Sequence, residues 1–438
     1  MFKWSRVRLI LSVLACEGLI STLIERVQIA EVKGKRASNS LDSGGISHRA
    51  AAAMYRDFTG VLHVHSTYSD GIGTIHDISL AAREAGVDYV LMCDHSNLDA
   101  LGNDEAGWRN DVLMLIGTEV TTDSGHLLVV DVSEDFLPCG KDSVGVQHRV
   151  DSFGGFSVIA LPCDLKDRWR DFDHRIPEVG LEVFNLSAIA RTKINLPALI
   201  LIWRRYHGRN RQSAFHLVSS RPKRELELWD NLAADAAAMD PPSRVVGIAS
   251  LDAHAVMKFG GRAYPYPTYS EIFRTLRTHV VIPVDAEFGQ RRESSTSDSD
   301  MKLAHQALSD GHCFMAYDNY ADSKGFIYTG SVGGSAEVLM GEFIQVPSGT
   351  DRLVTLSVSA PSQKSFGRMY RNGKLFASWV GPSFKIETQT AGVYRVEIFL
   401  YWYRIGYVFM GTRPWIFSNP IYVTQKKLAF AAVKPPSI

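Results

Sequence analysis

The segment Gly60-Val61-Leu62-His63-Val64-His65-Ser66-Thr67-Tyr68-Ser69-Asp70-Gly71 decides how the rest of the chain is interpreted. Its apolar, partly β-branched first half predicts a strand over Gly60 to His65, and the two-residue period of a strand puts both imidazoles on one face. Asp70 follows in a turn, where its carboxylate can reach back to the same place. Thr74 and Asp77 then form a capping-box-like helix start, and Gly86 marks the helix end.

The same cycle of short apolar run, polar tip and helical stretch recurs as far as Pro283. Further strands are predicted over Val87 to Asp94, Val112 to Val120, His126 to Val132, Phe156 to Leu161, Leu181 to Asn185, Val245 to Asp252 and Val280 to Val284. Alternation of this kind predicts an α/β fold with a parallel sheet, open or closed. In a β/α barrel, polar residues that follow the strands are candidate site residues by position alone.

Histidines and carboxylates stand at these strand ends. His95 follows the second strand, Glu119 ends the third, His126 opens the fourth, and Asp252 and His254 follow a late strand. The five cysteines include no C-x-x-C pair, which excludes a thiolate zinc site. A mixed nitrogen and oxygen set suits zinc, manganese or iron, and Glu119 could bridge two ions. Such ions convert a bound water to a hydroxide nucleophile, which predicts hydrolysis without a serine or cysteine nucleophile.

The composition limits the classes of binding partner, and the length and sequence pattern indicate how the chain divides into domains. The 438 residues carry 47 Lys and Arg against 47 Asp and Glu, so bulk charge indicates no nucleic-acid binding. We expect four segments: a signal, tether or N-terminal extension over 1–50, a metallohydrolase barrel over 51–290, a connector helix over 291–311, and a β-sandwich over 312–438. In the last, alternating runs and the hairpin turn Asn372-Gly373 predict antiparallel strands.

The N-terminus has a basic start followed by an apolar stretch from Leu9 to Ile24, which resembles a secretory signal peptide. Glu17 interrupts this stretch, which is also shorter than the roughly 20 residues of a membrane span. Export, membrane tethering and a cytoplasmic location with an amphipathic extension therefore all stay open.

Two features lie between the predicted strands: an apolar and basic stretch, and a group of cations in loops. The stretch Leu196 to Arg211 is apolar and basic, which favours a surface crossover helix. Cations that could bind a substrate anion occur in loops on the site's side: Arg168, Arg170, His174, Arg191 and His216.

The ligand series resembles the polymerase and histidinol phosphatase (PHP) superfamily of metal-dependent phosphoesterases over roughly Asp57 to Pro283. The residues that carry this resemblance are His63, His65, the run Tyr68-Ser69-Asp70-Gly71, Asp94-His95, Glu119, His126, and Asp252 with His254. Two runs look more like the carbaryl-hydrolase-like branch: Gly117-Thr118-Glu119-Val120-Thr121-Thr122 with Gly125-His126, and Pro414-Trp415-Ile416-Phe417-Ser418-Asn419-Pro420-Ile421-Tyr422.

The resemblance implies a distorted seven-stranded β/α barrel with up to three metals. By analogy His63, His65, Glu119 and Asp252 hold one ion, and Asp70, His95 and His254 hold a second. Glu119 and His126 would share a third with a histidine from a His-Pro step, and this chain has Leu161-Pro162 there. Leucine cannot coordinate a metal, although Cys163 or Asp164 could substitute if the loop shifts. We therefore expect two tightly bound ions and a weakened third position.

The reaction expected is hydrolysis of a phosphoester by a metal-bound hydroxide, with Glu119, Asp252 and His254 as the catalytic residues. A second interpretation keeps the metals and changes the substrate to a carboxylic ester, carbamate or amide. In a third, the chain is an exported binding protein whose site has lost activity, as Leu161 would indicate. All but the third predict a small-molecule ester or amide substrate.

Overall fold

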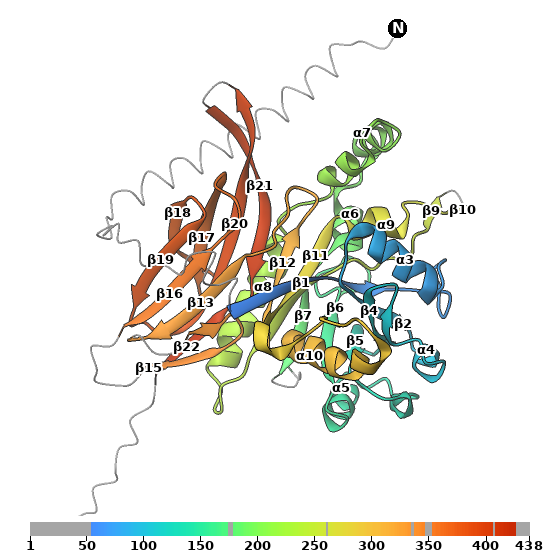
Figure 1. Cartoon of the computed structure of the whole chain (residues 1–438), viewed down its shortest axis with the longest axis horizontal. Coiled ribbons are helices and arrows are strands. Elements are labelled where there is room, and N and C mark those ends of the chain that lie inside the picture. The colour runs from blue at the N-terminus through green and yellow to red at the C-terminus, as the bar shows by residue number, and fades with distance from the viewer. Residues whose placement is uncertain are drawn as a thin grey trace, which may run out of the picture.

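The computed structural model describes residues 54–173, 178–259, 262–333, 337–346, 353–405 and 408–425 (Figure 1). The expected signal peptide or tether within residues 1–50 lies outside these ranges, as does the candidate cation His174. Within them, no helix combines the length and the apolar character needed to cross a membrane.

The first strands of the sheet run parallel. Strand β1 (Tyr55–Val64) pairs with β2 (Tyr89–His95), and β2 pairs with β4 (Val112–Thr121). Helix α3 (Ile75–Ala85) connects β1 to β2; Thr74 and Asp77 form its capping box, and Gly86 ends it in the left-handed conformation at φ 72°. The helix predicted from these caps is confirmed.

The predicted parallel sheet is interrupted at β5 (His126–Val130), which runs antiparallel to both β4 and β6 (Phe156–Ala160). Only residues 122–125 separate β4 from β5, so the chain reverses in a tight turn and has no room for a crossover helix. Gly125 makes that turn at φ 141°. Parallel pairing resumes with β7 (Val179–Asn185) and β8 (Val245–Ser250).

The residues that follow β8 connect this strand back to β1. The Leu251 amide donates to the Leu62 carbonyl, the Ala253 amide to the His63 carbonyl, and the His65 amide to the Ala253 carbonyl. These bonds close the strands into a ring at the end where the candidate ligands lie.

Helices cover the outside of this ring (Figure 1). Trp229 of α8 (Lys223–Ala237) is fully buried and donates through Nε1 to the Val245 carbonyl. Gly247 of β8 makes that packing possible, because a Cβ there would lie 2.5 Å from the Trp229 ring. Further elements before β11 are β3 (Gly107–Arg109), α4 (Asp99–Gly102), α5 (Ser143–Ser152), α6 (Leu186–Lys193), α7 (Leu196–Tyr206), β9 (Met257–Phe259), β10 (Arg262–Tyr264) and α9 (Tyr269–Phe273).

On the other side of β1 the sheet continues into the C-terminal strands. Strand β11 (Leu276–Pro283) pairs antiparallel with β1, and β12 (Cys313–Tyr317), which follows α10 (Ser297–Ser309), pairs antiparallel with β11. The sheet then runs through β21 (Val408–Ser418), β20 (Gly392–Ile405), β22 (Ile421–Gln425) and β15 (Phe343–Val346), with β17 (Ser365–Arg371) and β18 (Lys374–Val380) on its flank.

A second sheet packs against these strands in two layers. It consists of β14 (Val338–Leu339), β13 (Ile327–Val332), β16 (Val354–Ser359) and β19 (Ser383–Thr388). Leu356 from this sheet and Val396 from the other are fully buried in one apolar core. Asn372 and Gly373 make the predicted hairpin turn between β17 and β18, both at positive φ. The division of the chain into segments 51–290, 291–311 and 312–438 stays a prediction.

Candidate metal centre

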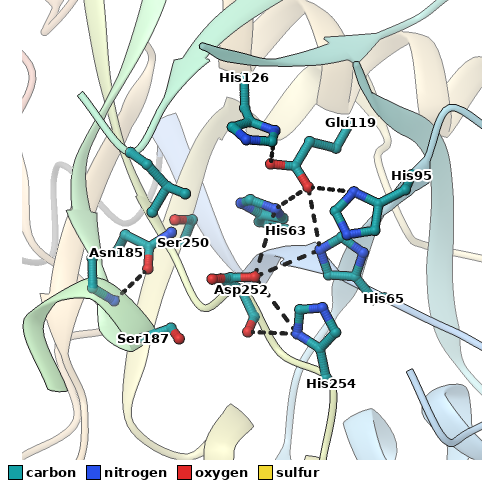
Figure 2. Close-up of polar contacts among 12 residues, drawn as sticks. His63, His65, His95, Glu119, His126, Asn185, Ser187, Ser250, Asp252 and His254 are labelled. Carbon is teal, nitrogen blue, oxygen red and sulfur yellow. Dashed lines mark hydrogen bonds and ion pairs between the residues drawn. The ribbon is translucent and has the colours of Figure 1, made fainter. Parts of the chain in front are cut away.

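Imidazoles and carboxylates from five strands converge at one end of the ring (Figure 2). His63 and His65 come from β1 and the residue after it, His95 from β2 and Glu119 from β4. The structure brings together all the candidate ligands that the sequence indicated: His63, His65, Asp70, His95, Glu119, His126, Asp252 and His254. Their role as metal ligands stays a prediction.

The Glu119 carboxylate lies at the centre of the cluster and faces two ways. Its Oε2 lies 3.4 Å from His63 Nε2, 3.7 Å from His65 Nε2 and 2.9 Å from His95 Nδ1. Its Oε1 lies 3.3 Å from His126 Nδ1 on the opposite side. A carboxylate placed in this way can serve two neighbouring cations, as the sequence predicted for Glu119.

Asp70 and His254 form a second group at the rim. His254 Nε2 lies 2.9 Å from Asp70 Oδ1, and His95 Nε2 lies 3.5 Å from the same oxygen. The His254 ring stacks on His65 with 4.1 Å between centroids. Two sets of ligand atoms come within 4.8 Å of one another: one from His65, Asp70, His95 and His254, and one from His63, His65 and Glu119. His65 belongs to both sets.

Asp252 lies between these two groups. Its Oδ1 is 3.6 Å from His65 Nε2 and 4.0 Å from His63 Nε2, and it is also 3.6 Å from His254 Nδ1. Asp252 takes a left-handed backbone conformation at φ 52°, which costs free energy for a residue with a Cβ and is typical of functional sites.

The imidazoles of His63 and His65 face the same site because of a β-bulge and not because of the two-residue alternation of a strand. His63 is at φ 61°, and the pairing of β1 with β2 shifts register between Leu62 and Val64, so a bulge falls on His63. The bulge re-aims the His63 side chain, and its ring centroid lies 5.0 Å from that of His65. Both rings are completely buried.

Asp94, which precedes the candidate ligand His95, holds the turn that carries Asp70. Its carboxylate accepts hydrogen bonds from the Ser66 amide and hydroxyl and from the Ser69 hydroxyl, at 2.8, 2.7 and 2.5 Å. Gly71 lets this turn close, because a Cβ there would lie 2.2 Å from the His65 carbonyl oxygen. The turn is therefore fixed from both sides.

Glu182 of β7 is a site residue that the ligand pattern missed. It is fully buried and lies 2.6 Å from His63 Nδ1 through Oε1, while its Oε2 accepts from the Leu161 amide at 2.9 Å and from Asn185 Nδ2 at 3.1 Å. A charged residue inside the strand Val179–Asn185, which is otherwise apolar up to Phe184, is the signal that could have identified it.

Burial and charge set the ionisation of the cluster. Burial alone would lower the pKa of His63, but Glu182 and Glu119 outweigh it and raise that pKa well above its ordinary value. Burial and then the neighbouring imidazoles lower the pKa of His65. Burial opposes ionisation of Glu119, but His63 and the other imidazoles hold its pKa well below the usual range. His65 therefore stays neutral and offers a lone pair.

The donor atoms fit a divalent cation. Nε2 of His63 and Nε2 of His65 are buried nitrogens without a hydrogen-bond partner, and both face the Glu119 and Asp252 oxygens. Leaving buried polar atoms unpaired costs about 1–3 kcal/mol each. Coordination of a cation between these nitrogens and carboxylates would satisfy all of them at once.

The neighbourhood of Leu161 differs from the histidine site that the resemblance implies. Leu161 is buried at φ 50°, and Asp164 turns away to Arg191, whose Nη2 lies 3.0 Å from Asp164 Oδ2. Burial raises the pKa of the Cys163 thiol to about 11, which disfavours the thiolate that a metal would need. In the described contacts neither Cys163 nor Asp164 meets His126.

Arg191 of α6 is the candidate cation that the structure places at the cluster. Its Nη1 lies 3.7 Å from Asp252 Oδ2, and its side chain is 46% exposed. His216 instead packs against Tyr320 and lies 3.0 Å from the Asn319 carbonyl through Nε2. Arg168 and Arg170 are exposed on the loop after β6.

A cavity of about 790 Å³ opens beside the ends of β2 and β4. Ser96 and Asn97, which follow His95, line one part of it, and Val120 and Thr121, which follow Glu119, line another. Its volume suits a small organic molecule.

Comparison with known proteins adds two solved structures. No family model matches this chain, and no curated protein matches it. A two-domain protein from Bacteroides vulgatus containing a predicted PHP-like metal-dependent phosphoesterase is 12% identical, with a TM-score of 0.37 over 83% of this chain and 95% of that one. A provisionally assigned metal-dependent phosphoesterase from Bifidobacterium adolescentis is 16% identical, with a TM-score of 0.24 over 30% of this chain and 83% of that one.

Proposed function

We propose that this chain is a metal-dependent hydrolase of the PHP type that cleaves a phosphoester. One observation carries the proposal: the buried Nε2 atoms of His63 and His65 have no hydrogen-bond partner and face the Glu119 and Asp252 carboxylates. Buried polar atoms in a structural core are rarely left unpaired, and these two nitrogens lie side by side facing carboxylates. The ligand series of the sequence supports the PHP assignment.

Two cations account for the arrangement. His63, His65, Glu119 and Asp252 would hold the inner one, and Asp70, His95 and His254 would hold the outer one, with His65 between them. A third position at Glu119 and His126 lacks the imidazole that Leu161 replaces, so we expect it to bind weakly. Bound divalent ions would activate water and neutralise charge on the substrate.

The chain's own residues supply orientation and charge. Glu182 fixes the His63 ring through Nδ1, which leaves Nε2 directed at the cluster. Asp252 lies beside His254 at the rim, and its carboxylate can accept and return a proton during turnover.

Arg191 favours a phosphoester over a neutral substrate. Its half-exposed guanidinium is held by Asp164 and Ser187 beside Asp252, where its remaining N–H groups could donate to phosphoryl oxygens. A second candidate substrate class, a carboxylic ester, carbamate or amide, follows from the runs that resemble the carbaryl-hydrolase-like branch.

Hydrolysis of nitrophenyl phosphate and of nitrophenyl acetate by manganese- or zinc-loaded protein tests the reaction. We expect turnover of the phosphate, its loss on chelation, and its loss in Asp252→Ala. Exposed Asp173→Ala is the matched control. Turnover of the acetate alone would favour the second substrate class, and tight metal binding without hydrolysis of either would favour a binding protein.

A further inference from the structure

Helix α7 (Leu196–Tyr206) projects from the body of the molecule (Figure 1). Its outer face is apolar. Ala198, Ile202, Arg205 and Tyr206 are half-buried and form the inner face. Large apolar side chains on and just before the helix are exposed instead: Ile194 (41%), Leu199 (38%), Ile200 (57%), Leu201 (41%) and Trp203 (58%). An apolar group of this kind on a protein surface marks an interaction site.

The segment around α7 is also strongly basic. Between Glu182 and Glu225 the sequence contains no acidic residue, although the whole chain is balanced. In that stretch the cations are Arg191, Lys193, Arg204, Arg205, Arg209, Arg211, Arg221, Lys223 and Arg224. Three of these cations are paired with carboxylates: Arg191 with Asp164, Arg211 with Glu271, and Arg221 with Glu397. Glu271 also accepts from Tyr206 on the inner side of α7. The outer face is therefore apolar and positive.

The β9–β10 hairpin beside α7 has the same character. Tyr266, which follows β10, stacks against Tyr206 with 6.0 Å between ring centroids. Met257 is 39% exposed and Arg262 is exposed, and no acidic residue occurs between Asp252 and Glu271. Two neighbouring elements thus present exposed apolar side chains together with positive charge.

We propose that α7 and the β9–β10 hairpin form a docking surface for a bilayer that contains anionic phospholipid. Exposed Leu, Ile and Trp next to Arg is the composition of helices that lie in the membrane interface, where the apolar side chains enter the acyl region and Arg meets the headgroups. With 11 residues α7 is about 16 Å long, so it lies along the surface and does not cross it.

Charge argues for a bilayer rather than a second copy of the chain. A two-fold contact through α7 would bring the Arg204 and Arg209 charges of both copies into one interface, and the sequence between Glu182 and Glu225 offers no acidic residue to pair with them. Such juxtaposition of like charges opposes association, whereas anionic headgroups neutralise both.

Docking would also orient the candidate metal centre. Helix α6, which carries Arg191 beside Asp252, leads directly into α7. The open end of the cluster would then lie near the membrane. The docking proposal does not depend on the hydrolysis proposed above, and a soluble ester assay without vesicles tests that function separately.

Vesicle flotation of the full chain tests the surface, with vesicles of phosphatidylcholine mixed with phosphatidylglycerol and vesicles of phosphatidylcholine alone. We expect binding to the mixed vesicles that falls with added salt. Removing the charges in Arg204→Gln and Arg209→Gln should weaken it about fivefold each. The double variant Ile200→Glu/Trp203→Glu should weaken it on the order of a hundredfold.

Matched controls lie on the C-terminal strands. Leu375→Glu changes a side chain that is 44% exposed on β18, and Lys385→Gln removes an exposed charge on β19. Both should bind vesicles like the unmodified chain, and the exposed positions of all variants predict unchanged circular dichroism. The predicted N-terminal tether is the same in every variant.

A second measurement follows Trp203 itself. Phospholipids with brominated acyl chains quench indole fluorescence on contact, so they should quench the unmodified chain more than Trp203→Phe. Equal quenching of the two would overturn the proposal, as would equal flotation of the α7 variants and the controls. Sedimentation that shows a dimer lost in Ile200→Glu/Trp203→Glu, with vesicle binding unchanged, would assign the face to a second copy instead.

Discussion

Glu182 holds the Nδ1 side of His63 at 2.6 Å while the Nε2 side of the same ring faces Glu119 at 3.4 Å. A carboxylate can only accept, so Nδ1 carries the hydrogen, and the ring orientation is fixed from behind. Glu182 also accepts a hydrogen bond from the Leu161 amide. It therefore connects the backbone at Leu161, where the resemblance implies a histidine ligand of a third metal, to the His63 ring of the inner site.

Replacing Glu182 by Gln should weaken metal binding. The amide fills the same space but lacks the charge that orients His63 and raises its basicity. Loss of such a supporting contact typically costs 10–100-fold in metal affinity. Calorimetric titration of the metal-free variant with manganese or zinc measures the change. Glu178→Gln, at an exposed position just before β7, is the control, and equal affinities of the two variants would contradict this role.

Replacing Leu161 by His should add a third bound ion. The left-handed backbone at φ 50° suits His better than a bulkier branched residue, and the amide bond to Glu182 needs no change. The new imidazole would join His126 and Glu119 Oε1, which already lie 3.3 Å apart. Elemental analysis after dialysis should rise from two ions to three. Leu161→Gln, which offers no imidazole, should stay at two.

Much of this site could be predicted from local sequence. The candidate ligands His63, Glu119 and Asp252 each follow or end an apolar run, and the ends of parallel strands meet at one edge of a sheet. Helix α3 was equally predictable, because its caps Thr74 and Gly86 act within one turn of the chain.

Long-range features were not predictable in this way. The antiparallel pairing of β5 with β6 and the bulge at His63, which depends on its register with β2, both involve strands that are distant in the sequence. Glu182 is separated by 119 residues from the ring that it orients, so only its burial in an apolar strand could have drawn attention to it.

Replacing Arg191 by Gln should impair phosphoester binding more than turnover. The guanidinium beside Asp252 would contact the anionic group in the ground state, so its loss should raise KM about tenfold with a smaller change in kcat. Activity on an uncharged acetate ester should change little. Steady-state kinetics on both esters distinguishes the cases, with exposed Arg168→Gln as control. Equal changes in KM and kcat for both esters would show that Arg191 supports the structure of the site and does not contact the phosphoryl group.

Stability should fall at alkaline pH because of His279 on β11. The ring is fully buried between Asp57 and Asp318, and although burial opposes the charge, these carboxylates raise the pKa of His279 to about 9. Because folding raises this pKa, the charged ring stabilises the folded state fully at pH values below about 6.5, the pKa of His in the unfolded chain. The stabilisation is lost as the pH rises through about 9.

Urea unfolding between these two pH values measures the effect, which we expect to be on the order of 3 kcal/mol. In His279→Gln the free energy of unfolding should be lower at neutral pH and nearly independent of pH over this window. A slope in the variant equal to that of the unmodified chain would assign the loss to other groups.

Arg395 on β20 should be needed to hold α8 against the C-terminal strands. It is buried, and it donates to both oxygens of Asp230 on α8, at 2.6 and 2.7 Å, and to Glu397 at 2.6 Å. Replacing it by Met would fill the space but leave Asp230 without its partner and Glu397 with only Arg221. Breaking a buried charge pair costs about 3–5 kcal/mol, because the remaining charge is desolvated and uncompensated. Chemical denaturation should show that loss in Arg395→Met and almost none in Lys385→Met on exposed β19. Equal stability of the two variants would mean that apolar packing alone joins α8 to β20.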